Sequence, residues 1–157
     1  MKILVFSDSH GEYTAMKAAI RQQTAAEVVL FCGDGEEDID CVKREFPDKM
    51  FVAVRGNCDW GSSLPYSETL FLEGKKIFMT HGHLYKVKMY YEEIINYAHE
   101  IGADILLFGH THTAYTDYDD GLYIMNPGSA SGYSATYGII EITKAGIMTN
   151  VVPLPRV

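Results

Sequence analysis

Short apolar runs alternate with apolar residues at helical spacing in the first part of the chain. Apolar runs at 2–7 and 27–32 are typical of strands buried on both faces, and 50–55 is predicted to be the third strand. Between them, apolar side chains recur at helical spacing within 12–23 and 36–46, which predicts two helices. The first third of the chain is therefore expected to fold as alternating strands and helices, in the manner of an α/β protein.

The remainder of the chain is richer in strands. A hairpin is predicted from 67–72 and 76–80, and the longest helix is predicted over 87–101, where Gly102 provides a stop. Further strands are predicted at 104–108, 114–118, 122–125, 136–143 and 147–154. No internal repeat or long linker divides the sequence, so one domain over 1–157 is expected.

Composition and charge exclude several classes of protein. The chain of 157 residues is 47% hydrophobic and 22% charged, which is ordinary globular composition. Its longest apolar runs are too short to cross a bilayer, and Asp8 and His10 end the N-terminal run below secretory length, so a cytoplasmic protein without a membrane partner is expected. The three cysteines have no CxxC spacing and indicate neither a disulfide framework nor a thiolate zinc site. A net charge of -8 argues against a nucleic-acid partner.

Side chains that can bind metal ions follow five of the predicted strands. The five motifs are Asp8-Ser9-His10, Gly33-Asp34-Gly35, Gly56-Asn57-Cys58-Asp59, His81-Gly82-His83 and Gly109-His110-Thr111-His112. In open α/β sheets, ligands bind beyond the carboxyl ends of the strands, and the neighbouring glycines let the backbone turn sharply there. Each motif alone has a plainer interpretation, such as a helix cap, a tight turn or a buried thiol. Their occurrence together, each after a strand, indicates one shared metal site.

The order of these motifs resembles that of the calcineurin-like metallophosphoesterase superfamily. The short chain, the Gly-Asn-Cys-Asp motif at 56–59 and the later Asn126-Pro127-Gly128-Ser129 are similar to small bacterial and archaeal phosphodiesterases related to the retromer subunit of eukaryotes. For the fold, the resemblance implies an α/β architecture in which two mixed β-sheets pack face to face and are flanked by helices. This is a four-layer αββα sandwich.

The resemblance also implies a site for two divalent metal ions. Seven residues carry over as ligands: Asp8, His10 and His112 for the first ion, Asn57, His81 and His110 for the second, and Asp34 as a bridge. A carboxylate can bridge because it has two oxygens. Oxygen and imidazole donors suit Mn²⁺, Zn²⁺, Fe, Ni²⁺ or Co²⁺, and Mn²⁺ is expected to support activity.

The reaction expected of such a site is the hydrolysis of small phosphodiesters, by attack of a metal-bridging hydroxide on phosphorus. Many members of the superfamily place a histidine after the Gly-Asn pair to protonate the leaving oxygen. Cys58 occupies that position here, and a thiol has no cationic form that could offer a proton. The candidate catalytic residues are therefore His83, to assist departure of the leaving group, and Asp59, in a structural hydrogen-bonding role. The alternative for His83 is a histidine that only supports a metal ligand, or a simple loop residue. Phosphodiesters with good leaving groups should be cleaved best.

Substrate contacts are expected from four residues, although the 126–129 loop could equally be a rigid turn. These residues are Asn57, Cys58, Asn126 and Ser129. The acidic run at 36–40 places favourable charge at a helix N-terminus and could also repel polyanionic substrates.

Two other functions remain open beside the phosphodiesterase. One is a phosphomonoesterase of the same superfamily, and the other is a non-catalytic, protein-binding scaffold resembling the retromer subunit. That scaffold departs from the ligand pattern at key histidines, whereas all seven ligand positions here hold residues that can bind metals. A small phosphodiester is the expected partner, and assembly into a homo-oligomer is left open.

Overall fold

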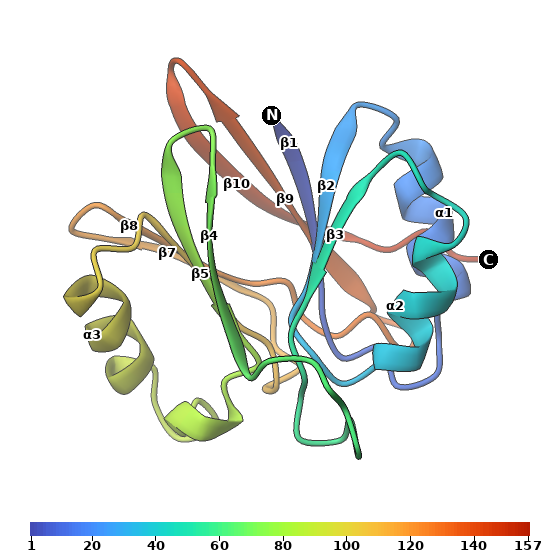
Figure 1. Ribbon diagram of the computed structural model, residues 1–157, viewed down its shortest axis with the longest axis horizontal. Coiled ribbons are helices and arrows are strands. Elements are labelled where there is room, and N and C mark those ends of the chain that lie inside the picture. The colour runs from blue at the N-terminus through green and yellow to red at the C-terminus, as the bar shows by residue number, and fades with distance from the viewer.

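The computed structural model describes residues 1–157 and contains two five-stranded sheets that pack face to face (Figure 1). The first sheet has the order β10-β9-β1-β2-β3, formed by β1 (Lys2–Phe6), β2 (Ala26–Phe31), β3 (Met50–Ala53), β9 (Thr136–Thr143) and β10 (Gly146–Pro153). The second sheet has the order β4-β5-β6-β8-β7, formed by β4 (Ser67–Leu72), β5 (Lys75–Thr80), β6 (Ile105–Leu107), β7 (Tyr115–Asp119) and β8 (Leu122–Asn126). Both sheets contain parallel and antiparallel pairs, so the mixed character predicted for them is confirmed.

Helices cover the two outer faces and complete the four layers. The helices α1 (Thr14–Gln22) and α2 (Glu36–Lys43) pack on the first sheet, and α3 (Glu92–Glu100) packs on the second (Figure 1). A single 3-10 turn, η1 (His83–Tyr85), follows β5. The predicted αββα sandwich is therefore confirmed. None of the helices has both the length and the apolar content needed to span a bilayer.

The β1 strand shows why so apolar a segment is needed at the centre of the first sheet. Successive side chains of a strand point to opposite faces, so one strand can supply two cores. Ile3 and Val5 pack in the core between the two sheets, whereas Leu4 and Phe6 pack with Met16 of α1 on the outer face. All five side chains are fully buried.

The predicted helix over 87–101 is wrong at its beginning, because α3 begins only at Glu92. Lys86 has a φ of 56°, a left-handed conformation that an α-helix cannot continue. Val87 is buried in the core of the second sheet beside Phe108, so it is a core residue of a turn. The spacing between Val87 and the apolar residues of α3 is that of a helix, although Val87 lies in a turn.

The strand directions determine where the conspicuous loops meet. The strands β1, β2 and β3 run parallel to one another in the first sheet, as do β5, β6 and β8 in the second. The loops that follow these strands gather at one edge of the sandwich, on the lower side in Figure 1. All five motifs identified in the sequence lie in these loops.

Candidate metal centre

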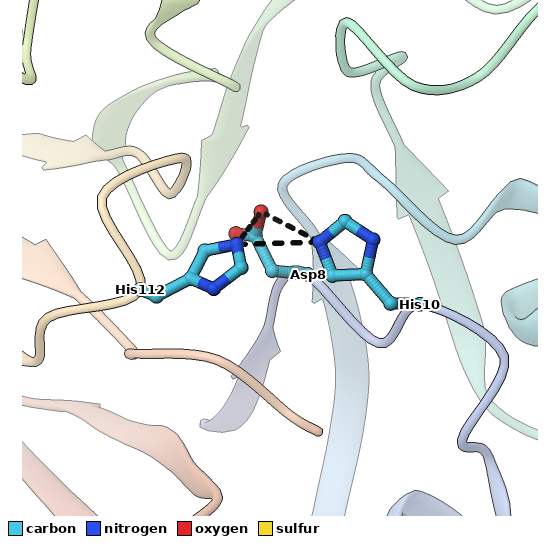
Figure 2. A group of neighbouring side chains, drawn as sticks. All are labelled: Asp8, His10 and His112. Atoms are coloured by element: carbon cyan, nitrogen blue, oxygen red, sulfur yellow. Dashed lines mark hydrogen bonds and ion pairs between the residues drawn. The ribbon is translucent and has the colours of Figure 1, made fainter. Parts of the chain in front are cut away.

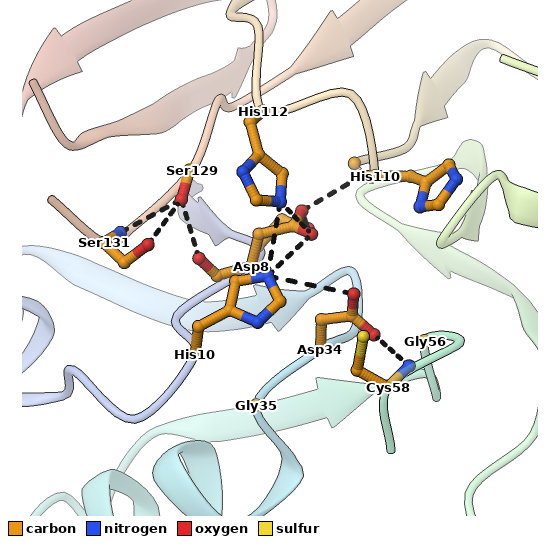
Figure 3. Close-up of polar contacts among 12 residues, drawn as sticks. Asp8, His10, Asp34, Gly35, Gly56, Cys58, His110, His112, Ser129 and Ser131 are labelled. Atoms are coloured by element: carbon orange, nitrogen blue, oxygen red, sulfur yellow. Dashed lines mark hydrogen bonds and ion pairs between the residues drawn. The ribbon is translucent and has the colours of Figure 1, made fainter. Parts of the chain in front are cut away.

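Acidic and imidazole side chains from both sheets converge at this edge. Oδ1 of Asp8 lies 3.2 Å from Nε2 of His112 and 3.6 Å from Nε2 of His10 (Figure 2). Oδ2 of Asp34 lies 3.2 Å from Nε2 of His81 and 3.9 Å from Nε2 of His10. Asp34 therefore lies between the Asp8–His10 side of the cluster and the His81 side. Figure 3 shows its contact with His10.

The cluster consists of two groups of three potential ligands. Nδ1 of His110 lies 3.2 Å from Nε2 of His81, which completes the second group. In each group the three ligand atoms lie within 4.8 Å of one another, the groups being Asp8, His10 and His112, and Asp34, His81 and His110. Six of the seven ligands predicted from the sequence are thus brought together.

One oxygen of Asp8 lacks a hydrogen-bond partner. Oδ2 accepts hydrogen bonds from the Ser7 hydroxyl and, at 3.0 Å, from the backbone N–H of His110. Oδ1 is buried without a partner and faces the imidazole nitrogens of His10, His112 and, at 3.8 Å, His81. An unpartnered buried carboxylate oxygen is unfavourable unless a cation or a donor satisfies it. This donor set fits a divalent cation.

The orientation of His81 is determined by the strand-end loop of the other sheet. Its ring is fully buried, and Nδ1 lies 2.7 Å from the backbone carbonyl of Cys32, to which it can donate a proton. This hydrogen bond directs Nε2 toward Asp34 and Asp8. Histidines that bind metals commonly donate their second N–H to a carbonyl or carboxylate in the same way.

The charges within the cluster shift the pKa of three members. Burial alone would raise the pKa of Asp34, but its hydrogen bond to His81 and the charge of that ring hold the pKa well below its usual range. Burial would also lower the pKa of His81, but Asp34 and the charge of Asp8 raise it above the ordinary value. Burial and the charge of His81 together lower the pKa of His110 to about 4. His110 is therefore neutral at pH 7, which is the form that binds metals.

The backbone of this region adopts conformations that L-residues usually avoid. Among all non-glycine residues, eight have a positive φ, and five of those eight are predicted ligands. These five are Asp8 (55°), His10 (43°), Asp34 (63°), His110 (69°) and His112 (61°). Unfavourable backbone conformations of this kind concentrate at functional sites, where the surrounding structure enforces them.

Two glycines permit the close approach of the loops. A Cβ atom on Gly56 would lie 2.0 Å from Oδ1 of Asp34, and one on Gly109 would lie 2.0 Å from the Ser7 hydroxyl. Any side chain at either position would displace a carboxylate of the cluster or the group that holds it. Glycine is therefore required at both positions for the loops to pack this closely.

Asn57 is the seventh predicted ligand, and its side chain makes no contact with the other six. Its side chain is exposed, and its Nδ2 donates to Sγ of Cys58 at 3.6 Å. Cys58 itself lies closer to the cluster, because its Sγ forms a third group with His10 and Asp34 in which the ligand atoms lie within 4.8 Å. The sequence suggested a substrate contact for Cys58 and gave no sign of this proximity to two predicted ligands.

Asp59 holds the loop of Asp34 and has no free oxygen for chemistry. Its buried carboxylate accepts hydrogen bonds from four backbone N–H groups, those of Asp34, Gly35, Glu36 and Gly56, at 2.8 to 3.1 Å. The contacts of this candidate catalytic residue are those of a positioning residue, consistent with the structural role expected for it.

Asn126 and Ser129 hold the other side of the cluster. Asn126 is fully buried, and its Nδ2 donates to the Gly109 carbonyl at 3.0 Å and to the Thr111 hydroxyl at 2.9 Å. The Ser129 hydroxyl donates to the backbone carbonyl of Asp8 at 2.8 Å (Figure 3). These contacts are those of the rigid turn that the sequence left open as an alternative to substrate contact.

His83 lies beside the cluster but outside the groups of potential ligands. Its ring centroid is 5.5 Å from that of His81 and 6.1 Å from that of His110, and its Nδ1 is buried without a hydrogen-bond partner. Burial and the charge of His81 lower the pKa of His83. His83 therefore lies next to two predicted ligands without belonging to either group.

Asp38 is a structural residue of the site that sequence reasoning missed. Its Oδ2 accepts hydrogen bonds from the Ser9 hydroxyl and, at 2.8 Å, from the backbone N–H of Gly11, so it holds the loop that carries His10. The only sequence signal for Asp38 is its place in the acidic run at 36–40, which predicts favourable charge at a helix N-terminus. Its side chain is only 7% exposed, which shows that Asp38 has a structural contact and is more than a charge on the surface of the helix.

A cleft of about 560 Å³ opens beside His10 and Asp34. Its walls come mainly from the beginning of α2 and from the loop after β3, and the other lining residues are Gly11, Gly35, Glu36, Glu37, Asp38, Asp40, Cys58, Asp59, Trp60, Gly61, Ser62 and Ser63. The indole of Trp60 is 88% exposed. Because the cleft contains several carboxylates and no lysine or arginine, its potential is negative.

The αββα sandwich and this acid-imidazole cluster define a metallophosphoesterase. The chain belongs to the calcineurin-like phosphoesterase superfamily, whose domain model matches residues 1–145. It is 34% identical over 130 residues to the probable metallophosphoesterase YsnB of Bacillus subtilis, covering 82% of this chain and 75% of that protein. It is 28% identical over 170 residues to the phosphodiesterase YfcE of Escherichia coli K12, covering 90% and 88% of the two chains.

Solved structures share the fold along nearly the whole chain. A predicted phosphoesterase of Streptococcus pneumoniae superposes with a TM-score of 0.82 at 26% identity, covering 97% of this chain and 88% of that one. Vps29 of Entamoeba histolytica, in a complex with zinc, superposes with a TM-score of 0.76 at 25% identity, covering 98% and 99%. The resemblance inferred from the motifs is thereby confirmed.

Proposed function

We propose that this protein is a dinuclear, Mn²⁺-dependent phosphodiesterase that hydrolyses small phosphodiesters in the cytoplasm. The observation that carries the proposal is the buried, unpartnered Oδ1 of Asp8, which faces imidazoles from both sheets while Asp34 lies between the two groups of ligands. Family membership and relatives such as the phosphodiesterase YfcE support the reaction class.

The proposed ligands divide between two ions. The first would be held by Asp8, His10 and His112, the second by Asn57, His81 and His110, and Asp34 would contact both. The exposed amide of Asn57 contacts Cys58, so it can change rotamer at little cost in burial to complete the second set. Oxygen and imidazole donors in these numbers suit Mn²⁺.

Two divalent cations, when bound, neutralise charge on a phosphoryl group and acidify water, which is the chemistry that hydrolysis requires. The protein's own contribution is to orient the donors. The carbonyl of Cys32 fixes the His81 ring, Asp59 fixes the backbone of Asp34, and Ser129 fixes that of Asp8.

Departure of the leaving group is assigned to His83, which lies beside His81 and His110. Cys58 has no cationic form with which to donate a proton, so the position after Asn57 does not serve this purpose. The imidazolium form of His83, or a water held by the ring, would donate the proton to a departing aryl oxide or alkoxide. Good leaving groups need little such help, which favours activated phosphodiesters as the best substrates.

A protein-binding scaffold is the alternative from another functional class, since Vps29 shares the fold. A scaffold has no need of six converging ligand side chains or of the five positive φ angles that present them. A phosphomonoesterase is disfavoured because Cys58 replaces a leaving-group acid.

The experiment that tests the proposal is a substrate panel with metal-stripped protein. Phosphodiesters and phosphomonoesters are offered after Mn²⁺, Zn²⁺, Ni²⁺ or Mg²⁺ is restored in turn. We expect Mn²⁺ to restore hydrolysis of aryl diesters, and His110→Ala to lose both metal binding and turnover. The matched control is His99→Ala, because His99 pairs with Asp119 on the surface and should leave both unchanged. Equal turnover of alkyl monoesters would contradict diester specificity, and full turnover without metal would contradict the proposal.

A further inference from the structure

The thiol of Cys58 lies where it can contact an ion held by His10 and Asp34. Its Sγ, a ligand nitrogen of His10 and a carboxylate oxygen of Asp34 all lie within 4.8 Å of one another (Figure 3). The separation of such atoms around one ion is of this order, since metal-ligand bonds in zinc sites are about 2.0 to 2.3 Å long. The side chain is exposed, so an ion can reach it from solvent.

The position of Cys58 is fixed from both sides. Its backbone N–H donates to Oδ1 of Asp34 at 2.8 Å, and its sulfur accepts from Nδ2 of Asn57 at 3.6 Å. The residue is thus connected to two proposed ligands, the bridging Asp34 and Asn57 of the second ion. These two hydrogen bonds hold the cysteine beside the cluster.

An independent observation indicates that a cation belongs at this point. Oδ1 of Asp8 is buried, lacks a hydrogen-bond partner and lies 3.6 Å from the Nε2 of His10. His10 belongs both to the group with Asp8 and His112 and to the group with Asp34 and Cys58, so the sulfur lies beside the ion that Asp8 and His10 would hold. Thiolate, imidazole and carboxylate are all donors that Zn²⁺ accepts.

We propose that Cys58 is a metal-selective ligand of the first ion. Its thiolate binds a thiophilic divalent cation such as Zn²⁺, Co²⁺ or Cd²⁺ together with His10 and Asp34, and it remains uncoordinated when Mn²⁺ is bound. As the sulfur-metal bond forms, the S–H proton passes to solvent, and no oxidant or reductant is needed. Soft thiolate ligands favour Zn²⁺, whereas Mn²⁺ prefers oxygen.

This inference rests on the proposed dinuclear site and extends it. The sulfur of Cys58 makes the site selective between metals, because it binds thiophilic ions such as Zn²⁺ and does not bind Mn²⁺. It also implies that the ion present determines whether Cys58 is available to a substrate or to a thiol reagent.

The test is spectroscopic and needs no measurement of activity. Metal-stripped protein is titrated with Co²⁺, and the absorption of the thiolate-to-cobalt charge-transfer transition in the near ultraviolet is recorded. We expect the band in the natural protein and in Cys41→Ser, which alters a half-buried thiol outside the cluster, and not in Cys58→Ser. Competition with a chelator should show Zn²⁺ affinity reduced about 10- to 100-fold by Cys58→Ser, while Mn²⁺ affinity changes less than about twofold.

The outcomes separate this inference from the proposed function. If the natural protein binds Co²⁺ but its spectrum and Zn²⁺ affinity are unchanged in Cys58→Ser, the role of Cys58 is overturned and the dinuclear site stands. If the natural protein binds neither Co²⁺ nor Mn²⁺, the proposed function itself is overturned. Circular dichroism of each variant establishes that the comparison is made between folded chains.

Discussion

The carboxylate of Asp59 accepts a hydrogen bond of 2.8 Å from the backbone N–H of Asp34, the residue proposed to bridge the two ions. The same carboxylate accepts from the N–H groups of Gly35, Glu36 and Gly56, so one buried side chain joins the loops after β2 and β3. The carboxylate proposed to bridge the ions is therefore oriented by a second acid, whose own two oxygens are occupied by backbone N–H groups.

Replacement of Asp59 by Asn should weaken both the fold and the metal site. The amide has one acceptor oxygen, and its NH₂ would confront backbone donors, each of which costs about 1 to 3 kcal/mol when buried and unsatisfied. We expect a lower free energy of unfolding in urea and a metal affinity about 10- to 100-fold lower.

Asp104→Asn is the matched control for this prediction. Asp104 accepts a 2.8 Å hydrogen bond from the backbone N–H of Lys76 at the opposite ends of the strands. It should lower stability and leave metal affinity unchanged. If both variants affected metal affinity equally, Asp59 would have no particular role in positioning Asp34.

Metal binding should stabilise the natural protein against heat, and Asp8→Asn should abolish this effect. A ligand at 100 times its dissociation constant stabilises by about 2.7 kcal/mol, which raises Tm by several degrees in a domain of this size. In Asp8→Asn the unpartnered buried oxygen is no longer charged, so the metal-stripped variant should be at least as stable as the natural protein.

Differential scanning calorimetry with and without Mn²⁺ measures both effects. Asp117→Asn, which changes an exposed acid outside the cluster, should keep the increase in Tm. An equal increase in Asp8→Asn would show that the ions bind elsewhere.

Metal affinity should fall as the pH is lowered. The pKa of His81 is raised above its ordinary value of 6.5 by Asp34 and Asp8, so an ion that binds Nε2 must displace a proton held more tightly than usual. Affinity should therefore be highest at pH values above this raised pKa and weaken as the pH passes down through it. His110, with a pKa of about 4, contributes no proton at neutral pH.

Calorimetric titrations in buffers of different ionisation enthalpy count the protons released. About one proton per site should come from the histidines near pH 7, and none at a pH well above the raised pKa. Affinity that is constant from about pH 8 to pH 6 would contradict the assignment of His81 as a ligand.

Neutralising an acid in the cleft should favour more highly charged substrates. Glu36 lines the cleft beside His10, and its charge repels a diester that carries an additional phosphate. We expect Glu36→Gln to raise kcat/KM for such a substrate about threefold at low salt, to raise it less for a diester with one charge, and to have little effect at high ionic strength. Glu27→Gln changes the net charge equally at an exposed site on β2 away from the cleft, and it should not discriminate between the substrates.

The role of His83 is tested by varying the leaving group. His83→Ala should lower kcat for diesters with poor, alkyl leaving groups by about 100-fold and change kcat little for those with nitrophenyl leaving groups. Metal affinity should be unchanged, because His83 lies outside the ligand groups. A uniform loss across all leaving groups would assign His83 to positioning the neighbouring histidines instead of to proton transfer.

The strands and the site loops could be predicted because both depend on local sequence. Strands buried on two faces need continuous apolar runs, and sharp turns after them need glycine beside the polar residue, as at Gly109 and His110. The family pattern then related the five loops to one another. The helix before Glu92 was overpredicted because burial of Val87 in a turn gives the same spacing as an amphipathic helix.

Contacts made between distant segments could not be predicted in this way. Asp38 holds Ser9 across 29 positions, and the proximity of Cys58 to His10 depends on how two loops pack. Neither contact leaves a periodicity or a motif in the sequence. The exposed side chain of Asn57, by contrast, matches the family motif, although the side chain that it contacts is Cys58 and not one of the predicted ligands.

The division of the proposed ligands between the sheets has a mechanical consequence. Asp8, Asp34 and Asn57 follow strands of the first sheet, whereas His81 and His110 follow strands of the second. The sandwich is otherwise joined mainly by the apolar core between its halves. An ion bound by residues of both sheets would act as a removable cross-link between them. The force needed to pull the two sheets apart should therefore be higher when the metal is present, and it should fall again after chelation.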